Sequence, residues 1–194
     1  EVKTGKLVKF SAQDCQFDYR SSIFKRAALD QYIIISLSLE LSTIPVAHTE
    51  YPALNTALKG TEPSPEAVFK AVCRIRREKL PDPVQIPNVG SFFKNPLVSS
   101  SLADKLSATF PTIPCYPQAD GLSKIPAAWL IEQCGYKGQR HGNVGVHAKQ
   151  ALVLVNFEGE GKELLALAQA IEADVNTKFG IQLDIEPRVY GHHT

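Results

Sequence analysis

The stretch "ALVLVNFEGEGKELLALAQAIEADVNTKFGIQLDIE", residues 151–186, changes its periodicity twice and thereby indicates the fold class. Residues 151–157 are apolar almost without interruption, which predicts a buried strand. Residues 181–190 alternate between apolar and polar side chains, as in a strand with one buried face. Residues 163–179 predict a helix that Gly180 ends, because apolar side chains recur on one stripe: Leu164, Leu167, Ala168, Ile171 and Val175.

The chain immediately before this stretch is interrupted by prolines and adds two predicted helices. One helix is expected near residues 102–109. The other starts at Pro126, continues through "PAAWLIEQC" and ends at Gly135. Residues 110–121 and the segment that carries Ser91 are expected to be loops. The resulting order of helices and strands predicts an α+β fold without internal repeats.

The first eighty residues predict two further strands and one helix. Residues 5–9 and the longer, β-branched segment 32–41 indicate a β-rich first part. Ser64 and Pro65 form an N-cap and first-turn pair that opens a helix with apolar residues at helical spacing: Val68, Phe69, Val72 and Ile75. Three prolines in "LPDPVQIP", residues 80–87, cannot continue that helix and predict a boundary between domains.

The composition excludes several classes of function. The chain has 194 residues, of which 44% are hydrophobic, and a net charge of +1, as expected for an ordinary soluble globular protein. Nucleic acid is not expected as a partner, because phosphate binding requires clustered basic residues. The short basic run "RIRREK", residues 74–79, is interpreted as the solvated face of a helix. No membrane partner is expected, since no apolar run approaches the ~20 residues of a membrane span.

Cysteine usage favours reduced thiols over a metal centre. The four cysteines are scattered without paired spacing, and the five histidines do not join them in a zinc pattern. This usage fits a cytosolic protein. The chain contains no methionine, not even an initiator, which favours a piece of a longer protein.

One serine lies in an unusual context. Ser91 is part of "GSFFKNP", residues 90–96, where Gly90 would let the backbone approach a ligand closely. The spacing does not match the G-x-S-x-G elbow of serine hydrolases, which disfavours hydrolase chemistry. The residues alone favour an ordinary turn serine.

Three other stretches permit chemistry but have simpler structural explanations. The glycine-rich segment "GYKGQRHGNVG", residues 135–145, could cradle a phosphate or merely connect two elements. Arg20 could clamp a carboxylate or form a surface ion pair. Glu186 and Arg188 could pair across strands, whereas a buried Glu186 could donate a proton or a hydrogen bond.

Six segments together resemble the MurB family, the flavin-dependent UDP-N-acetylenolpyruvoylglucosamine reductases of bacterial peptidoglycan synthesis. The resemblance covers residues 5–191 and rests on the order and spacing of these segments. They are "YRSSIFK", "KLPDP", "GSFFKNP", "YPQADG", "AAWLIEQCGYKG" and "EPRVYG". One departure precedes Glu186, where relatives commonly have a proline and this chain has Ile185.

The resemblance implies a cytoplasmic reductase. Such an enzyme converts UDP-N-acetylglucosamine enolpyruvate to UDP-N-acetylmuramate, using FAD as cofactor and NADPH as reductant. By its match to the family, Ser91 would be the proton donor to the substrate carbon. Arg20 and Glu186 match the residues that hold the substrate carboxylate and stabilise its enolate. Lys79 would supply positive charge near the serine.

The resemblance also implies contacts to the UDP and sugar parts of the substrate. Lys79 would share this task with residues elsewhere in the chain, namely Tyr51, Asn95, Tyr116, Lys137 and Gln150. Tyr51 would lie on a loop that closes over the diphosphate. These assignments follow from the family match alone.

The resemblance places most of the FAD-binding region outside this chain. Residues 1–80 and 181–194 would be the remainder of the flavin domain, and residues 81–180 the substrate-binding domain. We therefore expect no turnover by this chain alone. A stand-alone module that binds UDP-sugars without catalysis is the alternative. The oligomeric state and the origin of the terminal His-His-Thr stay open.

Overall fold

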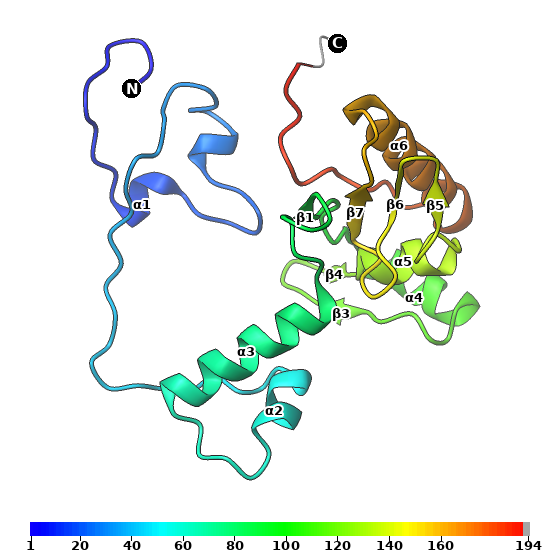
Figure 1. Ribbon diagram of the computed structural model, residues 1–194, viewed down its shortest axis with the longest axis horizontal. Coiled ribbons are helices and arrows are strands. Elements are labelled where there is room, and N and C mark those ends of the chain that lie inside the picture. Colours follow the sequence, from blue (N-terminus) through cyan, green and yellow to red (C-terminus); the bar gives the residue numbers. More distant parts are fainter. Residues whose placement is uncertain (192–194) are drawn as a thin grey trace. The chain divides into compact units, whose positions relative to one another are not determined.

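The computed structural model describes residues 1–191 and contains two compact units (Figure 1). The first unit comprises residues 1–46 and the second begins at Ala47. His192–Thr194, the segment whose origin the sequence leaves open, lies outside the described residues. The α+β fold class is confirmed, because short antiparallel sheets and helices occur together. The assignment of residues 1–80 and 181–194 to a flavin domain stays a prediction.

The first unit is held by a small aromatic cluster. Phe10, Phe24 and Tyr32 meet edge to face, with ring centroids 4.9 to 6.2 Å apart. The helix α1 (Ala12–Cys15) and the 3₁₀ helix Ile23–Lys25 are both shorter than two turns. The contacts among these three rings therefore contribute more to holding the unit together than its two short helices do.

The two strands predicted in the first unit are not formed. Residues 5–9 and 32–41 have no ladder, and the described part of this unit contains a single isolated bridge, between Asp18 and Ser21. A strand is stabilised by a neighbour that accepts its hydrogen bonds and covers one face. No segment described within the first unit offers such an edge, so the strand pattern is present in an unpaired, extended chain.

A helical pair opens the second unit. The helix α2 (Pro52–Leu58) packs against α3 (Pro65–Lys79) around Leu54, Leu58 and Ala71. The predicted N-cap is confirmed, because Ser64 Oγ accepts a hydrogen bond from the Ala67 amide at 3.2 Å. The basic run 74–79 is exposed except at Ile75, as expected for a solvated face.

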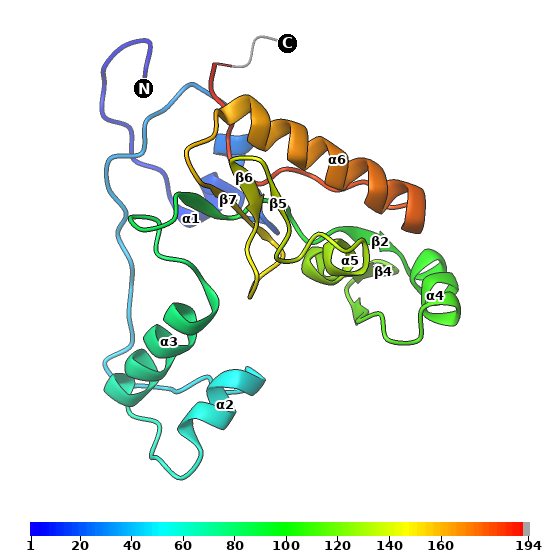
Figure 2. The ribbon, with the colours of Figure 1, turned by 45° about the vertical axis from the view of Figure 1, so that its right-hand side comes forward.

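The main body of the second unit is a four-stranded antiparallel sheet in the order β1-β7-β6-β5. Its strands are β1 (Asn88–Ser91), β7 (Val153–Asn156), β6 (Val144–Val146) and β5 (Arg140–His141). The helix α6 (Gly161–Phe179) contacts β6 and β7 and lies beside them in Figure 2. This helix confirms the helix predicted over residues 163–179, and β7 confirms the buried strand predicted within residues 151–157.

A smaller sheet lies beside the first. Strand β4 (Leu122–Lys124) pairs on one side with β2 (Leu97–Ser99) and on the other with β3 (Tyr116–Pro117). The helix α4 (Ser100–Thr109) continues directly from β2. The helix α5 (Ala127–Gln133) has Cys134 as its C-cap and is followed by Gly135, which has a left-handed φ of +83°. Both helices were predicted, whereas β3 lies in a segment predicted to be a loop.

One hydrophobic core joins these sheets and helices. Its fully buried members come from the strand, helix and turn segments alike: Phe93, Ile125, Leu130, Ile131, Leu154, Ile171 and Val175. Phe110, Trp129 and Phe179 add a cluster of tilted and edge-on rings. None of the helices described over residues 1–191 combines the length and apolar composition that crossing a membrane requires.

Two sequence predictions near the site need correction. Ser91 is the last residue of β1 rather than part of a loop, because it pairs with Val153. Residues 181–190 are extended but form only an isolated bridge between Phe93 and Ile185. Their alternation still buries Ile181 and Leu183. The segment pairs with its neighbour only at Phe93, and this contact is too short to form a ladder.

The contact between Tyr136 and Asp174 predicts a pH dependence of stability. Tyr136 donates a hydrogen bond of 2.7 Å to Asp174 Oδ2 on α6. Burial first, and then this bond and the carboxylate charge, raise the pKa of Tyr136 to about 12. Because this pKa lies above the unfolded value of about 10, the stabilisation is complete below about pH 10 and lost as pH rises through about 12.

We expect Tyr136→Phe to destabilise the protein at pH 8, a difference that shrinks as the pH approaches about 12. Urea unfolding at a series of pH values measures it. Tyr190→Phe, at a tyrosine that is 79% exposed, is the control and should match the wild type. A difference for Tyr136→Phe that is constant with pH would contradict the prediction.

Candidate functional site

Backbone hydrogen bonds bring Ser91 and Glu186 to the same place. The carbonyl of Phe92, the residue after Ser91, accepts a hydrogen bond from the Glu186 amide at 2.9 Å. The Phe92 amide donates to the carbonyl of Leu152 at 2.8 Å. Three segments that are distant in the sequence are thus adjacent, although sequence spacing alone gave no reason to join them.

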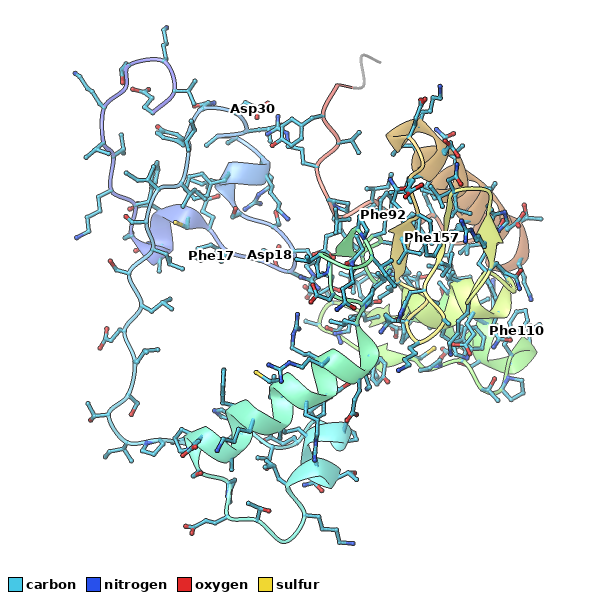
Figure 3. The ribbon with its side chains drawn as sticks, viewed as in Figure 1. Phe17, Asp18, Asp30, Phe92, Phe110 and Phe157 are labelled. Atoms are coloured by element: carbon cyan, nitrogen blue, oxygen red, sulfur yellow. The ribbon has the colours of Figure 1, made fainter. Side chains whose placement is uncertain are left out.

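The buried side chains of Phe92 and Phe93 hold this junction in place. They are 3% and 1% exposed, and their rings meet edge to face at 5.3 Å. Figure 3 labels Phe92 within the second unit. Ser91 and Glu186 are both half-buried, and the Oε2 atom of Glu186 is buried. The hydroxyl and the carboxyl group therefore lie at the margin of the core.

An irregularity in β1 positions Ser91. The register between β1 and β7 shifts between Asn88 and Ser91. Within the shift, Gly90 has a left-handed φ of +76° and donates its amide to Asn88 Oδ1 at 2.9 Å. A bulge of this kind changes the direction in which the following side chain points. Gly90 is therefore needed for its backbone conformation, and open space surrounds the position of a Cβ there.

Gln150 belongs to the same group of residues. Its side-chain Oε1 accepts a hydrogen bond from the Leu152 amide at 3.3 Å, and its carbonyl accepts one from Val153 at 3.0 Å. Val153 is the partner of Ser91 across the sheet. The turn before β7 thus places Gln150 close to Val153, the residue that lies opposite Ser91.

Asn95 has a structural contact that the sequence did not reveal. Its Oδ1 accepts a hydrogen bond from the Ala127 amide, the first residue of α5, at 2.9 Å. This amide is one of the donors that a helix leaves without an intrahelical partner. The amide nitrogen of Asn95 keeps two donors that could serve a ligand.

Tyr116 has a basic neighbour that the sequence analysis missed. Tyr116 on β3 lies directly opposite Lys124 on β4, and Leu97 on β2 lies on the other side of Lys124. Tyr116 is 53% exposed. Lys124 went unnoticed because its pairing depends on strands of two and three residues, which leave no periodic signal.

Lys79 and Tyr51 contact each other on the α2–α3 pair. The Nζ atom of Lys79 is 3.3 Å from the hydroxyl of Tyr51 and 5.6 Å from its ring centroid. No hydrogen bond or ion pair described for residues 1–191 links this pair to Ser91. Lys79 as a source of charge at the serine stays a prediction.

Lys137 and Arg20 stay predictions as substrate ligands. Lys137 forms a 2.8 Å ion pair with Glu132 near the end of α5. Arg20 belongs to the first unit and has a left-handed φ of +52°, within the turn that the reciprocal Asp18–Ser21 bonds close. A positive φ is uncommon for a residue other than glycine, and it is enriched at functional sites.

The glycine-rich segment 135–145 forms a hairpin. Gly142 lies in the turn between β5 and β6, and Arg140 packs over the ring of Phe157 at 4.5 Å. A Cβ on Gly145 would lie 2.7 Å from the carbonyl oxygen of Gln139, so this position requires glycine. The connecting role that the sequence allowed is confirmed, because the segment joins α5 to the β5–β6 hairpin.

A cleft of about 530 Å³ opens between the end of α3 and β1. Gly90 lines it, together with Arg76 and Arg77 from α3 and with His147 and Lys149 from the turn before β7. Its volume suits part of a ligand of drug or cofactor size. The lining carries three cations, Arg76, Arg77 and Lys149, and two acidic residues, Glu78 and Asp82, so its charge is mixed. None of Arg76, Arg77, His147 and Lys149 was predicted as a site residue.

His147 lines this cleft as a neutral side chain at pH 7. Its amide donates to the Val153 carbonyl at 2.9 Å, on the side of β7 opposite Ser91. Burial first, and then the charge of Lys149, lower the pKa of His147 below its ordinary value of 6.5. The Nδ1 atom accepts a bond from the Lys149 amide at 3.4 Å, which leaves the other ring nitrogen for the proton.

The described residues fit a bound dinucleotide in part. Arg76, Arg77 and Lys149 are suitable donors to a diphosphate. The glycine-rich segment 135–145, the candidate for a phosphate loop, leads from α5 into the β5–β6 hairpin. Among residues 1–191, no group of histidine, cysteine and acidic side chains is arranged to hold a metal ion.

Comparisons with known proteins agree on one family. A family model described as "UDP-N-acetylenolpyruvoylglucosamine reductase, C-terminal domain" matches residues 82–190. Curated proteins named UDP-N-acetylenolpyruvoylglucosamine reductase are 44% identical over 192 residues in Pseudomonas putida and 46% identical over 193 residues in Paraburkholderia phymatum. These matches cover 97% and 96% of this chain but 56% of each relative. The chain thus spans little more than half the length of the curated relatives that it matches.

The hydrogen bond from Ala127 to Asn95 predicts a stability effect. We expect Asn95→Ala to lower the free energy of unfolding by about 1 kcal/mol, because a helix-terminal amide loses its acceptor. Asn95→Asp is the matched control, since it keeps an oxygen at the same position. Denaturant unfolding compares the variants. Equal losses for both substitutions would show that the acceptor oxygen is not what stabilises α5.

Proposed function

The chain belongs to the UDP-N-acetylenolpyruvoylglucosamine reductase family, and we propose that it is the carboxy-terminal part of such a reductase. The intact enzyme would reduce UDP-N-acetylglucosamine enolpyruvate to UDP-N-acetylmuramate in the bacterial cytoplasm. The single observation that carries this proposal is the junction of Ser91 and Glu186 through Phe92, inside the region that matches the family model. It joins the proposed proton donor and the proposed carboxylate ligand.

The reaction adds a hydride and a proton across the carbon–carbon double bond of the enolpyruvyl group. FAD, itself reduced by NADPH, would supply the hydride when it is bound in the intact enzyme. Addition at the terminal vinyl carbon leaves negative charge on the carbon next to the carboxylate. We assign to this chain the residues that receive and quench that charge.

Ser91 would donate the proton to the carbon next to the carboxylate. A serine hydroxyl is protonated throughout the physiological pH range and is always ready to protonate a strongly basic carbanion. The bulge at Gly90 and the pairing with Val153 fix the serine's backbone, which supports a defined direction of proton transfer. The alkoxide would recover its proton from water.

Glu186 and Arg20 would bind the substrate carboxylate. A protonated Glu186 would donate a hydrogen bond to the carboxylate oxygen that gains charge as the enolate forms. Such a bond strengthens in the transition state and so lowers the barrier. The guanidinium of Arg20 would bind the carboxylate in both states.

The remaining assignments concern the nucleotide and the sugar. Tyr51 and Lys79 on the α2–α3 pair would contact the diphosphate, and Lys137 would contact another part of the UDP-sugar. Asn95, Tyr116 and Gln150 would contact the sugar part, with Lys124 added because it lies opposite Tyr116. Arg76, Arg77 and Lys149 are the residues of this chain that would face a diphosphate in the cleft.

Half-reactions of an intact enzyme test the role of Ser91. The enzyme would join this chain to the part of the Pseudomonas putida relative that the chain does not span. Ser91→Ala should leave flavin reduction by NADPH within about twofold of normal and slow reoxidation by the enolpyruvyl substrate by about 100-fold or more. Stopped-flow absorbance of the flavin measures both steps.

Two further variants complete this experiment. Ser107→Ala, at an exposed position of α4, is the control for loss of a hydroxyl and should behave as the wild type. Ser91→Cys keeps an acidic proton and should restore part of the reoxidation rate. Normal reoxidation in Ser91→Ala would remove this serine from the mechanism, whereas a wild-type fusion that does not reduce the substrate would overturn the proposed reaction itself.

The second unit contains Asn95, Tyr116 and Gln150 around its own core, which keeps a non-catalytic UDP-sugar module as the alternative function. Titration calorimetry of the 194-residue chain with UDP-N-acetylglucosamine distinguishes the two. We expect no measurable heat at millimolar ligand, because the flavin domain would complete the site. Binding below about 0.1 mM, an affinity near 5.5 kcal/mol, would support the module instead.

A further inference from the structure

Two backbone hydrogen bonds hold the segment that carries Glu186. The Glu186 amide donates to the Phe92 carbonyl at 2.9 Å, and the Lys94 amide donates to the Asp184 carbonyl at 2.9 Å. A regular antiparallel pair would exchange two bonds, but the Phe92 amide donates to the Leu152 carbonyl instead. A single backbone bond therefore joins Phe92 to Glu186, and side-chain contacts at this junction gain in importance.

An ion pair adds to these bonds. The Nζ atom of Lys94 lies 3.9 Å from Asp184 Oδ2, and 32% of the Lys94 side chain is exposed, so solvent screens the pair only in part. The isolated bridge at Ile185 places Lys94 opposite Asp184. Side chains two residues apart in an extended chain lie on the same face. The ion pair thus lies on the face of this segment to which the Glu186 side chain belongs.

An acidic neighbour makes the lysine more important. Glu172 on α6 lies close enough to Asp184 to feel its charge: burial first, and then that charge, raise the pKa of Glu172. Asp184 thus interacts with the cation of Lys94 and with a second carboxyl group. Loss of the lysine would remove an attraction and also leave the repulsion between the two carboxylates without the compensation that this cation provides.

We propose that Lys94 is a positioning residue for Glu186. By pairing with Asp184, its ammonium group keeps the Glu186 amide bonded to the carbonyl of Phe92. Both partners of the ion pair lie within residues 82–190, the region that matches the family model. The consequence for the reaction rests on the proposed role of Glu186 as a ligand of the substrate carboxylate, whereas the effect on the backbone contact does not.

Amide hydrogen exchange of the 194-residue chain, followed by NMR, tests the backbone contact. Lys94→Ala should speed exchange of the Glu186 amide by at least about 3-fold, because the junction opens more easily. Lys94→Arg keeps the cation and should exchange as the wild type does. The Phe92 amide, which is bonded to Leu152, is the internal reference and should keep its rate in both variants.

Two further variants separate this ion pair from charge effects elsewhere. Glu172→Gln removes the repulsion of Asp184 and, combined with Lys94→Ala, should restore part of the slow exchange of the Glu186 amide. Lys162→Ala removes an ion pair at the start of α6 and is the matched control, with no expected effect at Glu186. Unchanged exchange in Lys94→Ala would overturn the proposal, as would equal effects of Lys94→Ala and Lys162→Ala.

The fused enzyme of the half-reaction experiment tests the consequence for the reaction. Lys94→Ala should slow flavin reoxidation by the enolpyruvyl substrate by about 3-fold to 10-fold and keep reduction by NADPH within about twofold of normal. Lys94→Arg should restore reoxidation. Normal reoxidation in Lys94→Ala, in a fusion that Ser91→Ala slows, would overturn the positioning role. A wild-type fusion that does not reduce the substrate would instead overturn the proposed function, and exchange of the Glu186 amide would still decide whether Lys94 holds this contact.

Discussion

The burial of two adjacent phenylalanines is the constraint on which the rest of the second unit depends. Phe92 and Phe93 alternate across a short extended stretch, and both are almost fully buried. The backbone of Phe92 bonds on both sides, through its amide to the Leu152 carbonyl and through its carbonyl to the Glu186 amide. The central sheet, the turn before β7 and the segment after α6 are aligned by these bonds, and so are Ser91, Gln150 and Glu186.

Much of this fold could be predicted from the sequence, and the failures have a common cause. Long periodic segments such as α3, α6 and the strand around Val153 carry their own signal, because many residues share one face. Strands β1 to β6 pair over two to four residues, so they depend on neighbours that the local pattern does not specify. The segment 33–41 shows the converse, since its pattern defines a face but does not supply a partner strand.

The candidate site divides in the same way. The identities of Ser91, Glu186 and Gln150 came from the family resemblance, and the structure adds the backbone bonds that place them together. Lys124 and His147 could not be found from the sequence, because each becomes a neighbour of the site through a pairing across strands. Residue spacing along one chain contains no record of such pairings.

The hydrogen bond that Asn95 accepts has an entropic consequence for the ligand contact that we propose for this residue. Its side chain is already held by the bond from the first amide of α5, so its rotamer freedom is largely lost when the protein folds. A ligand that accepts a hydrogen bond from the same amide group would find it oriented in advance, and association would immobilise little that was not already fixed. Folding of α5 would thus preorganise the ligand contact that we propose for Asn95.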